Sequence, residues 1–408
     1  MGRNVKKKSI STVFRGLATR IDLAATKLCW ALPVKSNRIV FQSSIDYWDN
    51  PRVFCDYLVE KGLDKLYDIV WIVEDPKKYH SAGRVRFVKR NALAPSLIRD
   101  YMVATAKAVI FSHGCPAPHL KRRPHPKQTF ILTTHSASQL KRLINRTVRK
   151  HYDFILCCGQ HALKPRMETW EMGAERFPMV GMPRLDLMFT HRDCIKVMYP
   201  QHAGKKLILA METFKMSDRY IDAPESDDRY ALNVITSEEE LRELDAFVAK
   251  QNAILVIKTH RLQDMSYIEK MNLQNILFLN DDELQEKGVQ LNEFLENASL
   301  LLTDYSSVFY DYLLVNRPIG FMVGDIEEYT RGFIFDDPFS EMPGQKIQNL
   351  EELTSFIADS FEGKDSFEEE RMAIKARVFA HPDAKNCERL LNWLTEQHIL
   401  PSATSTSN

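Results

Sequence analysis

Ser306 and Ser307 stand where a strand-to-helix turn would offer hydroxyls and unpaired amides to an anion. The run 300–303 is apolar enough for a buried strand, and residues from Val308 onward have the spacing of an amphipathic helix. Serine is a favoured N-cap because its hydroxyl accepts a hydrogen bond from a free amide of the first turn, and the positive end of the helix dipole attracts phosphate. The pattern predicts a phosphate or pyrophosphate site, with an ordinary capped helix as the alternative.

Four more residues with useful chemistry directly follow apolar runs of the chain. They are His135, Lys258, His260 and Asp304. In open α/β sheets, ligands bind in the crevice beyond the carboxyl ends of the strands. We therefore expect these side chains to face one another across a cleft.

The apolar runs alternate with helical patterns, which is typical of parallel sheets covered on both faces. The first series predicts strands at 38–42, 68–73, 108–111, 128–132 and 154–157, with helices at 51–60 and 96–106. The second predicts strands at 207–211, 254–258, 276–279, 300–303 and 318–323, with helices at 237–250, 292–298, 350–361 and 366–379. A chain of 408 residues is too long for one typical core, so we expect α/β domains at 35–200 and 201–400 and a disordered tail at 401–408.

The net charge of +1 conceals two strongly basic blocks. Residues 1–35 carry eight Lys or Arg and one carboxylate, and residues 101–152 carry ten Lys or Arg and no carboxylate. Such polarity predicts a basic face for an anionic membrane or a phosphate polymer, with a plain solvated face as the alternative. We expect no nucleic acid as partner, because the chain has no recognised binding module and no basic stripe interleaved with aromatic residues.

Segment 1–34 has the pattern of a basic amphipathic helix. Its apolar residues recur at three- and four-residue steps, and its cations fall largely elsewhere, so it is expected to lie in the headgroup layer of an anionic membrane. Packing on its own domain is the alternative. No apolar run approaches the roughly 18–20 residues of a spanning helix, and no signal peptide is recognisable. Seven cysteines without a CxxC pair argue against disulfides or a zinc site and fit the cytoplasm.

Ordered motifs along residues 35–392 identify a family. Among them are Gly181-Met-Pro-Arg-Leu-Asp186, Ile257-Lys-Thr-His260, and Thr303-Asp-Tyr-Ser-Ser307 followed by Asp311. In order and spacing they resemble the CDP-glycerol glycerophosphotransferase family of teichoic acid and capsular phosphopolymer assembly. The resemblance implies a GT-B type fold, in which two Rossmann-like domains face each other across a cleft. It also implies that the C-terminal domain binds CDP-glycerol and that a lipid-linked phosphopolymer or saccharide acceptor meets the N-terminal domain.

The resemblance further implies a reaction and its residues. Glycerol phosphate passes to an acceptor hydroxyl, CMP is released, and the enzyme works as a peripheral protein at the cytoplasmic face of the membrane. His135 matches the family's Trp-His-Gly-Thr histidine, the expected general base, although Thr134 and Ser136 replace the tryptophan and glycine. His260 is expected to bind the donor pyrophosphate and to stabilise the charge that leaves with CMP.

The remaining candidates are assigned to the donor or to the acceptor side. Donor binding is expected from Lys258, Asp304, Ser306 and Ser307, and the acceptor or membrane face from Lys121, Arg122, Arg123, Lys141 and Arg142. Neither a cofactor nor a metal is expected, although Asp304 and Asp311 have two possible roles, ordering the serine loop or holding a cation. The alternatives are a loop histidine hydrogen-bonded to its own turn for His135 and a solvated lysine at the end of a strand for Lys258.

Two other functions remain open. The same fold could use CDP-ribitol or a nucleotide sugar as donor. A non-catalytic homologue that docks on the membrane is the third possibility, because the loop around His135 departs from the family's motif.

Overall fold

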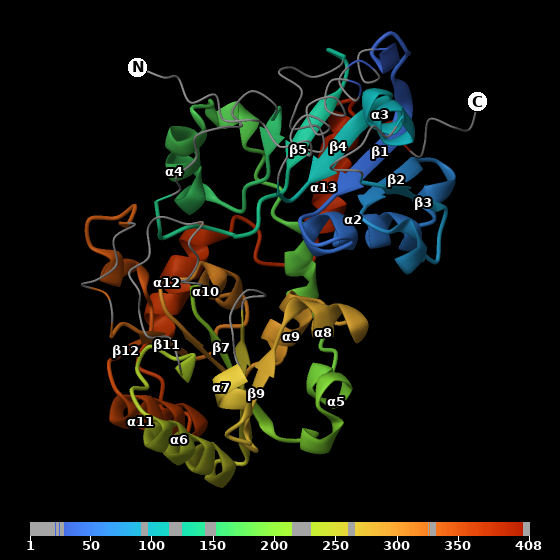
Figure 1. Cartoon of the computed structure of the whole chain (residues 1–408). Coiled ribbons are helices and arrows are strands. Elements are labelled where there is room, and N and C mark those ends of the chain that lie inside the picture. Colours follow the sequence, from blue (N-terminus) through green and yellow to red (C-terminus); the bar gives the residue numbers. More distant parts are fainter. Residues whose placement is uncertain are drawn as a thin grey trace, which may run out of the picture.

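The protein is built from two α/β domains, each around a six-stranded parallel sheet (Figure 1). The computed structural model describes residues 21, 24, 28–90, 97–113, 125–142, 152–213, 230–259, 266–324, 326 and 332–402. His260, Lys121, Arg122, Arg123 and most of the segment 1–34 therefore lie outside the described residues. No helix among the described residues is long and apolar enough to cross a membrane.

The two sheets share one strand order. In the first sheet it runs β3 (Val85–Lys89), β2 (Asp68–Val73), β1 (Lys35–Gln42), β4 (Ala106–Phe111), β5 (Thr129–Leu132), β6 (Phe154–Ile155). In the second it runs β9 (Ile276–Leu279), β8 (Ala253–Lys258), β7 (Lys206–Met211), β10 (Leu300–Thr303), β11 (Ile319–Met322), β12 (Gln345–Ile347). Numbered within each domain, both read 3-2-1-4-5-6, which is the Rossmann order. The predicted pair of Rossmann-like domains is confirmed.

Helices cover both faces of each sheet. In the first domain these are α2 (Asp49–Glu60), α3 (Leu97–Ala104) and α4 (Gln160–Trp170). The second series comprises α5 (Cys194–Met198), α6 (Glu238–Lys250), α7 (Ser266–Glu269), α8 (Asp281–Glu286), α9 (Leu291–Asn297), α10 (Val308–Tyr312), α11 (Leu350–Phe361), α12 (Glu368–Val378) and α13 (Asn386–Glu396). Alternate residues of β1 serve the two faces: Ile39 and Phe41 pack in the cluster that contains α2, and Val40 in the cluster that contains α3.

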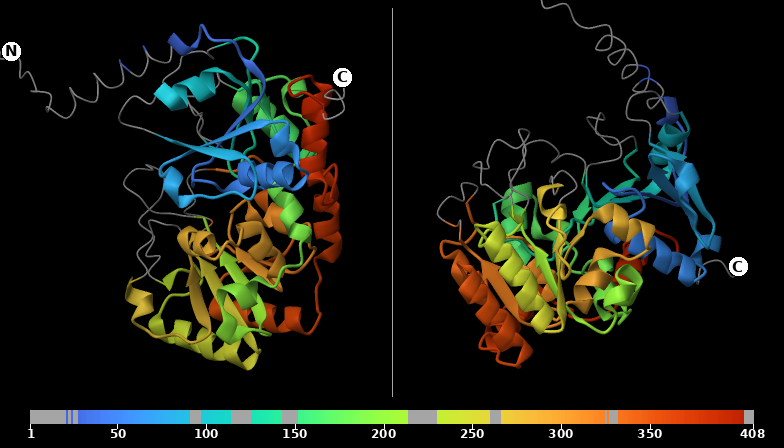
Figure 2. Two further views of the ribbon diagram at one scale, coloured as in Figure 1. Left: turned by 90° about the vertical axis from the view of Figure 1, so that its right-hand side faces the viewer. Right: turned by 60° about the horizontal axis from the view of Figure 1, so that its bottom comes forward.

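The C-terminal helix α13 belongs by packing to the first domain. Cys387, Leu390 and Leu394 lie in the same core cluster as Ile39 and Phe41 of β1. The left view of Figure 2 shows the red C-terminal segment running along one side of the molecule from the second domain to the first. The sequence analysis did not expect this return of the chain to the first domain. The domain boundaries that it expected remain a prediction.

One core cluster spans both domains. It joins Leu140 and Met182 of the first domain to Phe309 and Tyr310 of the second, all of them buried. A continuous apolar core of this kind fixes how two domains sit on each other, because separating them would expose it to water. The loop that carries His135 ends in this shared core.

Candidate active site

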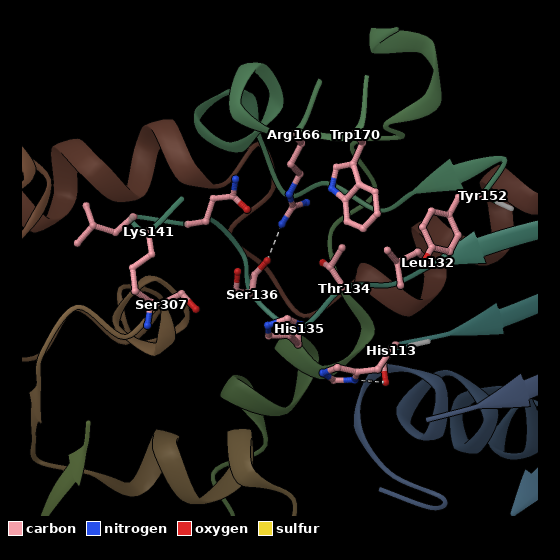
Figure 3. A pocket seen from close by; sticks show the side chains of 13 residues that line it. His113, Leu132, Thr134, His135, Ser136, Lys141, Tyr152, Arg166, Trp170 and Ser307 are labelled. Atoms are coloured by element: carbon pink, nitrogen blue, oxygen red, sulfur yellow. Dashed lines mark hydrogen bonds between the residues drawn. The ribbon is translucent and has the colours of Figure 1, made fainter. Parts of the chain in front are cut away.

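A cavity of about 290 Å³ opens where the two domains meet. Its walls come from the ends of β4 and β5, from the loop after β5 that carries His135, and from Ser307 of the second domain. In Figure 3 the rings of His135 and His113 lie together, with Ser307 on one side and Tyr152 and Trp170 on the other. His135 and Ser307, which the sequence analysis assigned to opposite domains, thus line the same cavity.

His113 is the neighbour of His135 that the sequence analysis left without a role. The two rings stack with centroids 4.8 Å apart and planes inclined by 15°, and Ser112 Oγ lies 3.0 Å from His113 Nδ1. His113 directly follows β4, the fourth strand of the Rossmann order, at the point where strand order reverses. Ligands bind at such a switch point, so the position of His113 after this strand could have identified it as a candidate site residue from the sequence.

The cavity holds both histidines in their neutral form. Both residues are exposed in part, but the walls of the cavity disfavour a charged imidazole. Burial, then His113 and Arg184, lower the pKa of His135 to about 4. Burial also lowers the pKa of His113. A neutral imidazole near pH 7 accepts a proton, which is the state that a general base needs.

The backbone around His135 is held by residues distant in sequence. Thr134 adopts the left-handed region, with φ of 56°, which is unfavourable for a β-branched residue. Asn50, fully buried, donates from Nδ2 to Thr134 O at 3.0 Å and accepts at Oδ1 from Arg184 N at 3.0 Å. Arg166 Nη2 donates to Ser136 O at 2.6 Å. The unusual loop is therefore held by neighbours that are distant in sequence, in addition to its own hydrogen bond from Ser136 Oγ to Ser138 O.

Arg184 and Asp311 connect this loop to the second domain. Arg184 Nη2 donates to His135 O at 2.5 Å and to Asp311 Oδ2 at 2.6 Å. Asp311, which is 2% exposed, also accepts from Ala137 N at 3.2 Å and from Asn292 Nδ2 at 3.2 Å. Burial alone would lower the pKa of Arg184, but Asp311 and then Asp49 raise it. Asp311 thus orders the histidine loop.

Asp304 orders the serine turn at the edge of the cavity. Its carboxylate accepts from Thr213 N and Oγ1 at 2.9 Å and from Ser306 N at 2.8 Å, and the residue is fully buried. Helix α10 begins after Ser307, as expected, but the Ser307 hydroxyl makes no capping hydrogen bond. The expectation of a serine N-cap bond was wrong for Ser307, because this residue has a helical backbone conformation and not the extended one of an N-cap, and the amide of Tyr310 donates to its carbonyl oxygen at 3.3 Å.

Two predicted cations reach across the domain boundary. Lys141 Nζ donates to Thr213 Oγ1 at 2.8 Å, and Arg142 Nε donates to Phe333 O at 2.7 Å. Lys258 lies elsewhere, with its ammonium 3.0 Å from Asp281 Oδ1 and 3.2 Å from Thr259 O. Lys258 is not in the described lining of the cavity, so its role in donor binding remains a prediction.

The described residues contain no group of three or more His, Cys, Asp or Glu side chains placed to hold a metal ion. The two carboxylates considered for a cation, Asp304 and Asp311, instead accept hydrogen bonds from backbone and side-chain donors. Of the two roles considered for them, their contacts favour loop ordering.

Comparison with known proteins extends these observations. The chain is 25% identical over 385 residues to a teichoic acid poly(glycerol phosphate) polymerase of Bacillus spizizenii, covering 86% of this chain and 90% of that protein. It is also 25% identical over 399 residues to a poly(ribitol-phosphate) polymerase of the same species, covering 88% of this chain but only 57% of that protein.

The fold matches a solved relative. The wall teichoic acid polymerase TagF superimposes with a TM-score of 0.71 at 20% identity, over 95% of this chain and 94% of that one. The expected GT-B type arrangement of the two domains is confirmed. The family model described as CDP-glycerol:poly(glycerophosphate) glycerophosphotransferase matches residues 24–396. With nearly the whole chain inside that match, the protein belongs to the CDP-glycerol:poly(glycerophosphate) glycerophosphotransferase family.

Proposed function

We propose that this protein transfers glycerol phosphate from CDP-glycerol to a hydroxyl of a lipid-linked acceptor and releases CMP. The observation that carries the proposal is the shared cavity of His135 and Ser307. It brings a neutral histidine of one domain to the serine turn of the other. Membership of the family and the relatives named as teichoic acid polymerases support a phosphotransferase of this type.

In the proposed mechanism His135 is the general base. The neutral ring accepts the proton of the acceptor hydroxyl as the hydroxyl oxygen forms a bond to the phosphorus of glycerol phosphate. The bond from that phosphorus to the bridging oxygen breaks, and the electron pair leaves with CMP. Burial is the main reason for the low pKa of His135, and His113, stacked on it, adds to this because the two adjacent rings oppose each other's protonation.

The second domain is proposed to hold the donor. Phosphoryl transfer depends mainly on positioning and on neutralising developing charge. Asp304 fixes the backbone of the serine turn, which supports a role for Ser306 and Ser307 beside the donor diphosphate. Lys258 and His260 are proposed to supply the positive charge and hydrogen bonds at the leaving group.

The acceptor is proposed to reach the enzyme at a membrane surface. Two apolar residues of the predicted N-terminal helix are exposed, Ile21 by 49% and Leu28 by 78%. Exposed apolar residues on a basic segment fit a helix lying in an anionic headgroup layer. We therefore propose a peripheral location at the cytoplasmic face, with Lys121, Arg122, Arg123, Lys141 and Arg142 on the acceptor side.

The test follows CMP release from CDP-glycerol with lipid-linked acceptors. His135→Ala is expected to lower kcat by about 10²–10⁴-fold, the usual contribution of a general base. His80→Ala is the matched control, since His80 is exposed and lies outside the described lining of the cavity. Turnover near the wild-type value in His135→Ala would remove this residue as base, and the parallel variant His113→Ala then decides whether its neighbour serves instead.

CDP-ribitol is the second candidate donor. The observation in its favour is that the poly(ribitol-phosphate) polymerase and the poly(glycerol phosphate) polymerase are equally similar to this chain, at 25% identity each. Parallel assays with CDP-glycerol, CDP-ribitol and a nucleotide sugar separate the alternatives by which donor releases its nucleotide. Absence of turnover with every donor in wild-type protein would favour a non-catalytic membrane-docking role.

A further inference from the structure

His161 lies at the start of α4, outside the described lining of the cavity, and contacts both domains. The start of this helix is held on the second domain, because Ala380 N donates to Cys158 O at 2.8 Å. A side chain at Gly159 would place its Cβ 2.5 Å from Val378 O, so only glycine permits this close approach of α4 to the end of α12. The side chain of His161 is only 3% exposed, so it is buried where the two domains meet.

Both ring nitrogens of His161 are hydrogen-bonded, one toward each domain. Nδ1 lies 2.7 Å from Ser138 Oγ, on the loop that follows β5 and carries His135. Nε2 lies 2.7 Å from Oε2 of Glu341, between β11 and β12. Arg377 of α12 holds the same carboxylate with two hydrogen bonds of 3.1 and 3.2 Å. A chain of hydrogen bonds therefore runs from the histidine loop through His161 to the second domain.

This chain does not depend on the charge of the imidazole. Burial alone would raise the pKa of Glu341, but hydrogen bonds from His161 and Arg377 lower it. The ionised carboxylate can only accept, so His161 Nε2 donates to it. The Ser138 hydroxyl can donate to a neutral ring or accept from a charged one, so both hydrogen bonds of His161 are kept in either state.

The set of serine, histidine and carboxylate is not a nucleophilic triad. In a triad the serine binds Nε2 of the histidine and the carboxylate binds Nδ1, whereas here the two nitrogens are exchanged. Ser138 is also fully buried, so a substrate does not reach its hydroxyl. These contacts therefore serve to position the loop and not to attack a substrate.

The ring of His161 also packs against the helix that follows the serine turn. Its centroid lies 5.4 Å from that of Tyr310 on α10, the helix that begins directly after Ser307. Tyr310 is fully buried, so α10 cannot shift without disturbing the packing around His161. His161 thus contacts the segments that carry both halves of the proposed site, the loop of His135 and the helix of the serine turn.

We propose that His161 is a positioning residue that sets the distance between His135 and the serine turn. This inference rests on the proposed transfer reaction, in which a base on one domain acts on an acceptor beside a donor on the other. A displacement of reacting groups by about 1 Å can lower a rate about 10²-fold. Loss of the hydrogen-bond chain is therefore expected to lower kcat and to leave both KM values near those of the wild type.

The first test is kinetic. His161→Leu is expected to lower kcat for CMP release about 10²-fold, with the KM values of donor and acceptor near those of the wild type. His202→Leu is the matched control, because His202 is a half-buried histidine before β7 that lies outside the described lining of the cavity. Wild-type kcat in His161→Leu would overturn the proposal, and so would a rise in KM without a fall in kcat.

A double-mutant cycle separates this coupling from a general loss of stability. Ser138→Ala removes one hydrogen bond of His161, and Glu341→Ala removes the other. Because the two bonds act in series, the double variant is expected to lose no more in kcat than the more damaging single variant. Single effects that multiply in the double variant would show that the two residues act independently and would overturn the proposal. Ser138→Ala also carries the kinetic test if thermal unfolding shows that His161→Leu does not fold.

Hydrogen exchange gives a reading that needs no turnover. Ser138→Ala and Glu341→Ala are each expected to speed exchange in the peptide covering 133–140, whereas His202→Leu should leave it unchanged. Wild-type exchange in both variants would show that His161 does not hold the loop. If the wild type releases no CMP from any donor, the proposed function fails, while the exchange experiment still decides whether His161 positions the loop of His135.

Discussion

Replacement of Asp311 by asparagine should loosen the histidine loop and destabilise the contact between the domains. Asp311 is the residue of α10 that accepts from Arg184 Nη2 at 2.6 Å and from Ala137 N at 3.2 Å. Asparagine has the same shape but no charge, so the change removes the ion pair with little loss of packing. Arg184 would then remain in the cleft with Asp49 as its remaining carboxylate, at 3.4 Å.

The size of the effect follows from burial. The side chains of Arg184 and Asp311 are 12% and 3% exposed, so the pair is largely removed from water. Breaking a buried pair by removing one partner typically costs 3–5 kcal/mol, because the other charge stays buried without compensation. Since Asp49 still compensates Arg184 in part, we expect a loss of about 2–4 kcal/mol in the free energy of unfolding.

Urea unfolding of the full chain measures the free energy, and hydrogen exchange of the peptide covering 133–140 measures the loop. Asp311→Asn is expected to lower the unfolding midpoint and to speed exchange in that peptide. Glu238→Gln breaks the exposed pair with Arg242 on α6, and as a matched control it should change neither. Wild-type exchange at 133–140 in Asp311→Asn would show that the interdomain pair does not hold the loop, and the reasoning would be refuted.

Three further predictions concern protonation and the membrane. NMR titration of the free protein should give His135 a pKa near 4, and His113→Gln should raise it, because His113, once protonated at low pH, opposes protonation of His135; an unchanged value would contradict the coupling. Burial opposes ionisation of Glu341, but hydrogen bonds from His161 and Arg377 lower its pKa. The ionised Glu341 therefore stabilises the folded protein at pH values above the ordinary pKa of a carboxyl group, and this contribution is lost as the pH falls. When the pH is lowered from about 5 to about 3, the free energy of unfolding should therefore fall less in Glu341→Gln than in the wild type. Denaturant titrations at each pH measure this difference. Deletion of 1–32 should lower binding to anionic vesicles in a flotation assay, and unchanged binding would exclude that segment as the anchor.

The strands of the buried sheets could be predicted closely from the sequence. β2, β9 and β10 begin and end at the predicted residues, because each is a continuous apolar run flanked by polar ones. The edge strands β3 and β12 were missed. β3 has two exposed, two half-buried and one buried residue, and β12 has only three residues, so neither carries the apolar run that marks a strand buried on both faces.

The candidate site was predictable in part. The order of the strands and helices places His135 and Ser307 after the carboxyl ends of two strands, so both could be expected to face the same cleft. The stacking of His113 on His135 could not be expected, because it depends on how two loops fold over the sheet edge.

The replacement of the family's tryptophan and glycine by Thr134 and Ser136 becomes understandable from the contacts of the loop. The positive φ lies at Thr134, where the family has tryptophan, and not at Ser136, where it has glycine, so the backbone at Ser136 does not require a glycine. The carbonyl oxygen of Thr134 accepts a hydrogen bond from Asn50. Asn50 also accepts from Arg184 N, and Arg184 in turn binds both His135 O and Asp311. The contacts that position the histidine loop therefore come from both domains.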